Sequence, residues 1–124
     1  MGTVENHILN ARQAKNNAKG VYESKDGNVS GVMTFFSLSI EHVLKAFHAY
    51  ENDGRTGFQG HNLGTILSHI EHDLGKYEDL IWEVDGMHIS SRYDSEFNTD
   101  LINDFDLIMQ KLISLINYIE RVNS

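Results

Sequence analysis

The seven histidines of this chain, set among carboxylates, are the residues best suited to carry chemistry. Imidazoles three or four positions apart share one face of a helix and can bind zinc, nickel or iron. His61, His69 and His72, with His42 from an earlier segment, are the candidates for such a site. The Glu-x-x-His pattern of di-iron bundles is absent, and solvated histidines on a polar face are the plainer interpretation. A histidine-rich metal site is therefore an alternative hypothesis, and no cofactor is predicted.

A charged pair in the segment SIEHVLKAF offers a second kind of chemistry. Glu41 and Lys45 are four residues apart, so they share a face if the segment is helical. On a solvated surface such a pair is common and contributes only about 0.3–0.5 kcal/mol. If the face looks into a bundle or dimer cleft, the same pair becomes part of a binding site.

The stretch GRTGFQGHNLG, residues 54–64, places glycines three apart directly before a predicted helix. A phosphate-binding loop needs a strand before it and a helix after it. No strand is predicted here, so Walker and Rossmann sites are excluded. Asn62 is a favoured N-cap residue, and His61 adjoins it. The plainer prediction is a loop that ends in a helix cap, and the more specific one is a helix start that binds an anion.

Arg92 and Tyr93 stand in a polar segment before the last predicted helix. An arginine beside a tyrosine offers a two-pronged phosphate contact and a ring for stacking, although ordinary loop packing is the plainer interpretation. The motifs GxSxG, SxxK and HExxH are absent from the sequence. Standard hydrolase chemistry therefore has no support from motifs.

Helical periodicity predicts the elements that must position these residues. Apolar residues recur at intervals of three and four near residues 3–24, 30–51, 63–84 and 101–119, and Gly75 is expected to kink or split the third segment. Strand signals are poor. We therefore predict an all-α fold, an antiparallel up-and-down bundle of four main helices forming a single domain over residues 1–124. The predicted loops are 25–30, 52–60 and 86–97.

The last segment carries an apolar face wider than a bundle core usually needs. Deep burial and self-association explain such a face equally well. The first apolar stripe of this segment consists of Leu101, Phe105, Ile108, Leu112, Leu115 and Ile119. A second stripe beside it consists of Ile102, Met109, Ile113 and Ile116.

Composition limits the classes of partner. The formal net charge is −8, and a surface this acidic argues against general nucleic-acid binding. The charge is uneven, because residues 1–25 hold four basic and two acidic side chains, which leaves six basic and sixteen acidic residues for the remainder. No cysteine is present, and neither a membrane-spanning run nor a signal-peptide pattern is seen. A cytoplasmic protein without a membrane partner is expected.

Three short motifs, in order, resemble the HEPN family of small prokaryotic helical-bundle domains. The family's E-x-x-L-K-A matches residues 41–46, and its H-D-L matches 61–63 with Asn62 in place of aspartate. Its R-Y-P matches 92–94 with Asp94 in place of proline. The resemblance implies a four- or five-helix up-and-down bundle that is commonly a homodimer. Many members are toxin–antitoxin partners of a minimal nucleotidyltransferase or have a proposed nucleotide-binding role.

The leading hypothesis is therefore a non-catalytic HEPN-type binding module for a nucleotide-like anion, a nucleotidyltransferase partner, or both. In this hypothesis Lys45 and Arg92 meet phosphate, Tyr93 stacks on the ligand and Glu41 orients Lys45. The residues expected to line the cleft are Glu41, Lys45, His61, Asn62, Arg92 and Tyr93.

A ribonuclease branch of the family supplies the alternative. Its R-x4-6-H motif carries a histidine that helps to activate a ribose hydroxyl. Arg55 and His61 fit this spacing, but they lie between the second and third predicted helices, whereas the family's motif generally falls later in the domain. Arg92 has no histidine downstream. A metal-independent endoribonuclease using Arg55 and His61 is therefore the second hypothesis.

Overall fold

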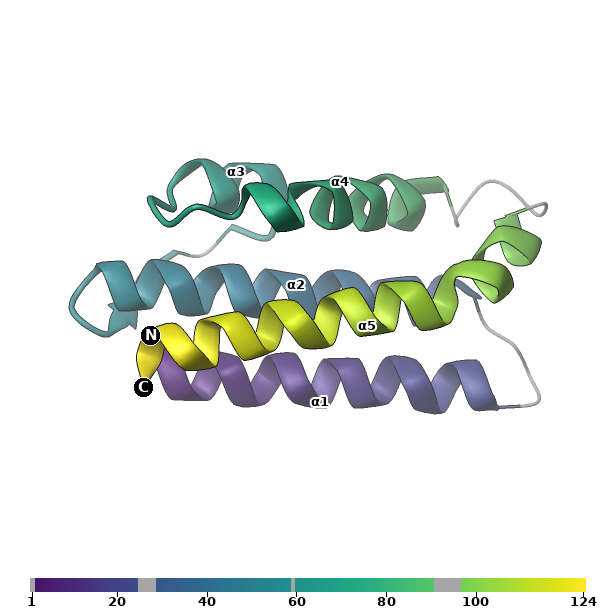
Figure 1. The fold of residues 1–124 in the computed structure, drawn as a ribbon, viewed down its shortest axis with the longest axis horizontal. Coiled ribbons are helices and arrows are strands. Elements are labelled where there is room, and N and C mark those ends of the chain that lie inside the picture. The colour runs from purple at the N-terminus through teal and green to yellow at the C-terminus, as the bar shows by residue number, and fades with distance from the viewer. Residues whose placement is uncertain (1, 25–28, 59, 91–96) are drawn as a thin grey trace.

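The computed structural model describes residues 2–24, 29–58, 60–90 and 97–124, without the side chains of residues 29–30, 55, 86–90 and 97–103. The described residues form five helices, and α3 and α4 follow one another in the same direction as the third of four lengthwise passes that alternate in direction (Figure 1). The all-α up-and-down bundle is thus confirmed. The helices are α1 (Val4–Glu23), α2 (Val29–Glu51), α3 (Leu63–Ser68), α4 (Gly75–Ser90) and α5 (Phe97–Asn123).

The third predicted helix is split, as its glycine suggested. Helix α3 ends at Ser68, and α4 begins at Gly75, whose N–H donates to the Asp73 carboxylate at 2.9 Å. Gly75 therefore starts a helix instead of kinking one. Helix α4 continues to Ser90, so the prediction of a loop over 86–97 was wrong for its first five residues.

A short strand pairing was not predicted. Strand β1 (Gly2–Thr3) pairs antiparallel with β2 (Arg55–Thr56), with Gly2 opposite Thr56 and Thr3 opposite Arg55. A two-residue strand has no room for the alternation by which strands are recognised in a sequence. The pairing fastens the segment before α1 to the loop that leads towards α3.

Helices α2 and α5 supply the centre of the core. The predicted stripe of α2 is fully buried: Met33, Phe36, Ile40, Leu44 and Phe47. The first stripe of α5 is also buried from Phe105 to Ile119, while Leu101 and Ile102 lie outside the described side chains.

The second stripe of α5 is only partly covered. Ile116 is buried, Met109 is half-buried and Ile113 is 38% exposed. Met109 and Ile113 line a groove of about 280 Å³ between α5 and α1, beside Lys15 and Lys19. Burial therefore accounts for most of the broad apolar face of this helix, and the groove is what remains.

The end of α5 lies beside the start of α1 (Figure 1). Arg12 forms an ion pair with Glu120, and Asn123 Nδ2 donates to Glu5 Oε1 at 3.4 Å. These two contacts join α5 to α1, the last helix of the bundle to the first. In the described part of the chain, no helix is both long and apolar enough to cross a membrane.

Candidate functional site

The Glu41–Lys45 pair on α2 is buried. The two residues are 8% and 7% exposed, and Lys45 Nζ lies 3.3 Å from Glu41 Oε2. Desolvation makes a buried ion pair costly unless its geometry and further hydrogen bonds compensate. The pair therefore differs from the solvated i,i+4 pair that is common on helices. It is the buried part of the candidate site.

His61 provides the further hydrogen bond. Its Nδ1 atom lies 3.1 Å from the same Glu41 Oε2, across twenty residues of sequence. An ionised carboxylate only accepts hydrogen bonds, so Nδ1 of His61 carries the proton. The His61 side chain is 79% exposed. A buried carboxylate thus orients the exposed ring, and Glu41 does not bond the other ring nitrogen, Nε2.

A second histidine pair, His7 with His42, belongs to the same region and was missed as a pair. The two Nδ1 atoms lie 2.9 Å apart, joining α1 to α2. One ring must donate and the other accept, so the two imidazoles hold different tautomers when both are neutral. Both imidazoles lie close enough to Glu41 to feel the charge of its carboxylate, so this pair adjoins the site.

Burial holds both imidazoles neutral. It lowers the pKa of His7 to about 4, helped by the nearby His42 and Lys45 and opposed by Glu41. Burial also lowers the pKa of His42, in spite of the adjacent Glu41 carboxylate. Nε2 of His7 is buried and has no hydrogen-bond partner. An orphaned ring nitrogen of this kind is costly, and it would be costlier still as part of an imidazolium.

The sequence did contain a signal for the burial of His7. Val4, Ile8 and Ala11 form the buried stripe of α1, and His7 lies three residues after Val4 and four before Ala11. A polar side chain on an apolar helical stripe is expected to find a partner inside the protein.

Asn62 caps α3, as the plainer prediction held. Its Oδ1 accepts from the Thr65 N–H at 3.0 Å and from Thr65 Oγ1 at 3.2 Å. The amide oxygen is therefore occupied, and α3 has only six residues. Asn62 fixes where the helix begins, directly after His61.

The four histidines of the metal hypothesis have separate hydrogen-bond partners. His61 contacts Glu41, His42 contacts His7, and His72 contacts Glu51. His69 Nδ1 donates to the backbone carbonyl of Thr65 at 2.8 Å. Among the described residues, no group of three or more potential ligands could hold a metal ion.

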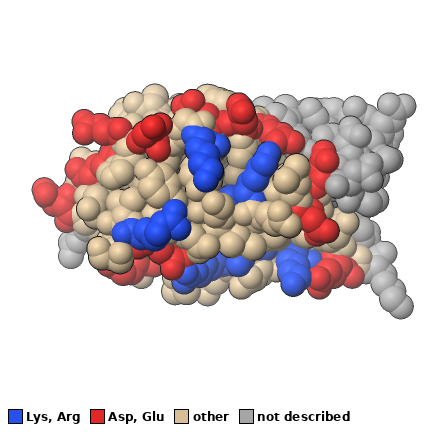
Figure 2. Space-filling model, in the orientation of Figure 1, with Lys and Arg blue, Asp and Glu red and all other residues tan. Residues whose placement is uncertain are grey.

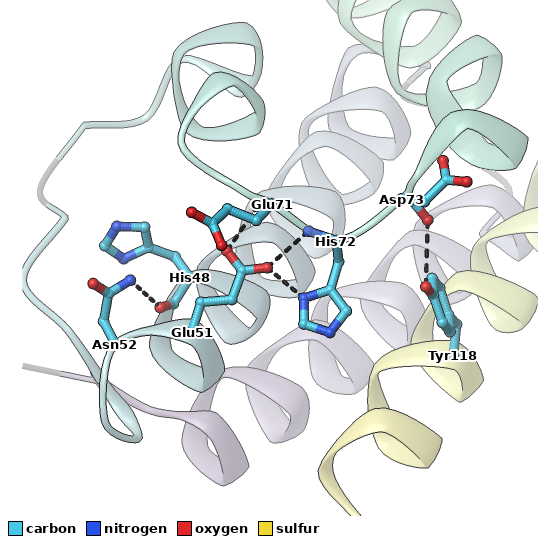
Figure 3. A network of polar contacts seen from close by, with 7 residues as sticks. All are labelled: His48, Glu51, Asn52, Glu71, His72, Asp73 and Tyr118. Atoms are coloured by element: carbon cyan, nitrogen blue, oxygen red, sulfur yellow. Dashed lines mark hydrogen bonds and ion pairs between the residues drawn. The ribbon is translucent and has the colours of Figure 1, made fainter.

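Glu51 forms a separate network at the end of α2 (Figure 3). Its carboxylate accepts the backbone N–H groups of Glu71 at 2.8 Å and His72 at 2.9 Å, and it also contacts Nδ1 of His72. Burial acts to raise the pKa of Glu51, but these three donors outweigh it and the pKa is lowered. The network fastens the segment between α3 and α4 to α2.

Three predicted site residues have side chains outside the described part of the structure. Arg55 contributes its backbone to β2, and its side chain lies outside the described residues, as do Arg92 and Tyr93 entirely. Of the predicted set, the structure brings together Glu41, Lys45 and His61.

Comparison of the chain with protein-family models, with curated proteins and with solved structures finds no match in any of the three. The resemblance to the HEPN family therefore rests on the sequence motifs alone.

Proposed function

We propose that this protein is a HEPN-type binding module that holds a nucleotide-like anion at the junction of α2 and α3. The observation that supports this proposal is the chain of contacts from Lys45 through Glu41 to the exposed ring of His61. The buried pair fixes the ring, and the ring meets the ligand. Preorganisation of this kind reduces the entropy lost on binding.

The chemistry of the exposed nitrogen suits a nucleotide. In the neutral ring Nε2 accepts a hydrogen bond, which a ribose hydroxyl supplies. In the protonated ring Nε2–H donates to a phosphate oxygen, while Glu41 Oε2 keeps Nδ1–H. Lys45 is buried against Glu41, so its role is to balance the charge of that carboxylate instead of contacting phosphate directly. Arg92 and Tyr93 retain their proposed roles in phosphate contact and stacking.

Thermal denaturation with ATP and other nucleotides tests the proposal. We expect a nucleotide to raise the melting temperature of the wild type, and His61→Ala to abolish the rise. Arg92→Ala should also reduce it. His69→Ala is the matched control, because His69 is exposed and contacts Thr65 instead of the Glu41 pair. A melting temperature that no nucleotide raises would refute the binding function.

We also propose the partners that the family resemblance implies, a homodimer and a complex with a minimal nucleotidyltransferase. Light scattering of the purified chain measures the first, and co-expression with a nucleotidyltransferase encoded next to this chain measures the second. A monomer at all concentrations that also purifies alone from such a co-expression would exclude both.

A ribonuclease is the second candidate function, and one contact favours it. The Glu41 carboxylate accepts a hydrogen bond from Nδ1–H of the exposed His61. The other ring nitrogen, Nε2, can then accept a proton, as a general base must. Arg55 would supply the positive charge. RNA cleavage lost in both His61→Ala and Arg55→Ala would support this function, and cleavage that persists in His61→Ala would exclude it.

A further inference from the structure

Trp82 is the sole tryptophan of the chain, and it is 51% exposed on α4. The outer end of its indole rests on Gly64 of α3. A Cβ atom placed on Gly64 would lie 2.8 Å from Trp82 Cη2 and 3.2 Å from Cζ3. The glycine therefore permits a close approach that no other residue type would allow without moving the ring. The indole is held at one end against α3 while about half of the side chain faces solvent.

Carboxylates lie on both sides of Trp82 along α4. Glu78, Asp79 and Asp85 lie four and three residues before Trp82 and three after it, so they flank it on the helix surface. Residues 61–85 carry six carboxylates against one lysine, a net charge of −5. Figure 2 shows acidic side chains along the edge that α3 and α4 occupy in Figure 1. Within the described residues, none of the three flanking carboxylates is in an ion pair.

We propose that Trp82 is the centre of a docking surface for a basic segment of a partner protein, with an arginine or lysine side chain stacked on the indole. Tryptophan is the best aromatic acceptor for a cation, and arginine also stacks on it as a plane. The flanking carboxylates pair with neighbouring basic residues of the same segment. They repel phosphate, so this surface takes a cationic ligand, whereas the site at His61, three residues before Gly64, is proposed for an anion. The docking proposal does not depend on the nucleotide proposal.

Binding of a fluorescently labelled arginine-rich decapeptide, followed by anisotropy at low and physiological salt, tests the docking surface. We expect saturable binding by the wild type that weakens at higher salt. Trp82→Leu should weaken it at least tenfold, and Trp82→Phe should weaken it less, because a smaller ring still accepts a cation. Replacing two flanking carboxylates (Glu78→Gln with Asp79→Asn) should weaken binding and flatten its salt dependence. Circular dichroism establishes that each variant is folded.

A charge-matched control separates this surface from general attraction to an acidic protein. Glu23→Gln with Asp106→Asn removes two carboxylates beside the α1–α5 groove and should bind the peptide as the wild type does. Equal losses in this control and in the Glu78/Asp79 variant would overturn the proposal. Binding of the peptide by Trp82→Leu with wild-type affinity would also overturn it. Self-association of the wild-type chain that is lost in Trp82→Leu would do the same. Quenching of Trp82 by nucleotides but not by the peptide would also overturn it.

Discussion

The Nδ1 atoms of His7 and His42 lie 2.9 Å apart and form a hydrogen bond between α1 and α2. The contact joins residues 35 apart in the sequence, next to the carboxylate that holds His61. It works only while at least one imidazole is neutral, because two protonated rings are both donors and repel each other. The stability of the bundle is therefore linked to pH.

The unfolding free energy should fall as the pH drops from about 6.5 towards 4. The pKa of His7 is about 4 in the folded chain, below its ordinary value of 6.5. Between these two pH values the unfolded chain therefore binds a proton on this imidazole that the folded chain does not bind. The stability that the neutral His7 contributes is fully present above its ordinary pKa, and about 3 kcal/mol of unfolding free energy is lost once the imidazole is protonated in the folded chain. In His7→Phe, urea unfolding across this range should show a shallower pH dependence. His69→Gln is the control, and an unchanged slope in His7→Phe would contradict the assignment.

Breaking the buried Glu41–Lys45 pair from one side should be more harmful than replacing both partners. Lys45→Met or Glu41→Leu alone leaves an uncompensated buried charge and should cost about 3–5 kcal/mol of unfolding free energy. The double variant should be more stable than either single one. The exposed pair Lys19–Glu23, at 4.0 Å, is the matched comparison, and Lys19→Met should cost less than about 0.5 kcal/mol. Additive losses in the double variant would show that the two side chains are not coupled.

Glu51→Gln should destabilise the protein by about 1–3 kcal/mol, because the amide cannot satisfy the three donors that the carboxylate accepts. Chemical denaturation at pH 7 measures the effect. Glu71→Gln is the matched control, since the network uses only the backbone N–H of that residue. Equal stabilities of the two variants would rule out a structural role for the Glu51 network.

Gly64→Ala should displace the indole of Trp82 with little net change in stability. The new Cβ would meet the ring at 2.8 Å, but an exposed side chain can move aside. Alanine also improves the helix by up to about 1 kcal/mol. The fluorescence of the sole tryptophan should therefore shift to longer wavelength while the melting temperature changes by only a few degrees. An unaltered emission spectrum would mean that the ring does not rest on Gly64.

Periodicity predicted the helices because each one buries a stripe of apolar residues, as Met33 to Phe47 of α2 illustrates. Local chemistry also predicted the cap at Asn62, since a cap involves residues only three apart. The i,i+4 spacing placed Glu41 and Lys45 together, but it could not tell a solvated pair from a buried one.

What escaped prediction depends on how helices are turned towards one another. The His7–His42 contact requires a particular rotation of α1 against α2, and no local pattern records it. The partners of Glu51 are mostly backbone N–H groups, which every residue except proline carries, so the sequence does not mark them. The β1–β2 pairing escapes for a different reason, because two residues are too few to show the alternation that marks a strand.

The contact between Asn123 and Glu5, with the nearby Arg12–Glu120 pair, brings the last turn of α5 to the first turns of α1. A short peptide bridge between the two would make the chain a ring without disturbing any helix. Circular permutants opened at a different surface turn would then keep every interhelical neighbour. The packing of this bundle specifies which helices touch, and it leaves open which of them comes first along the chain.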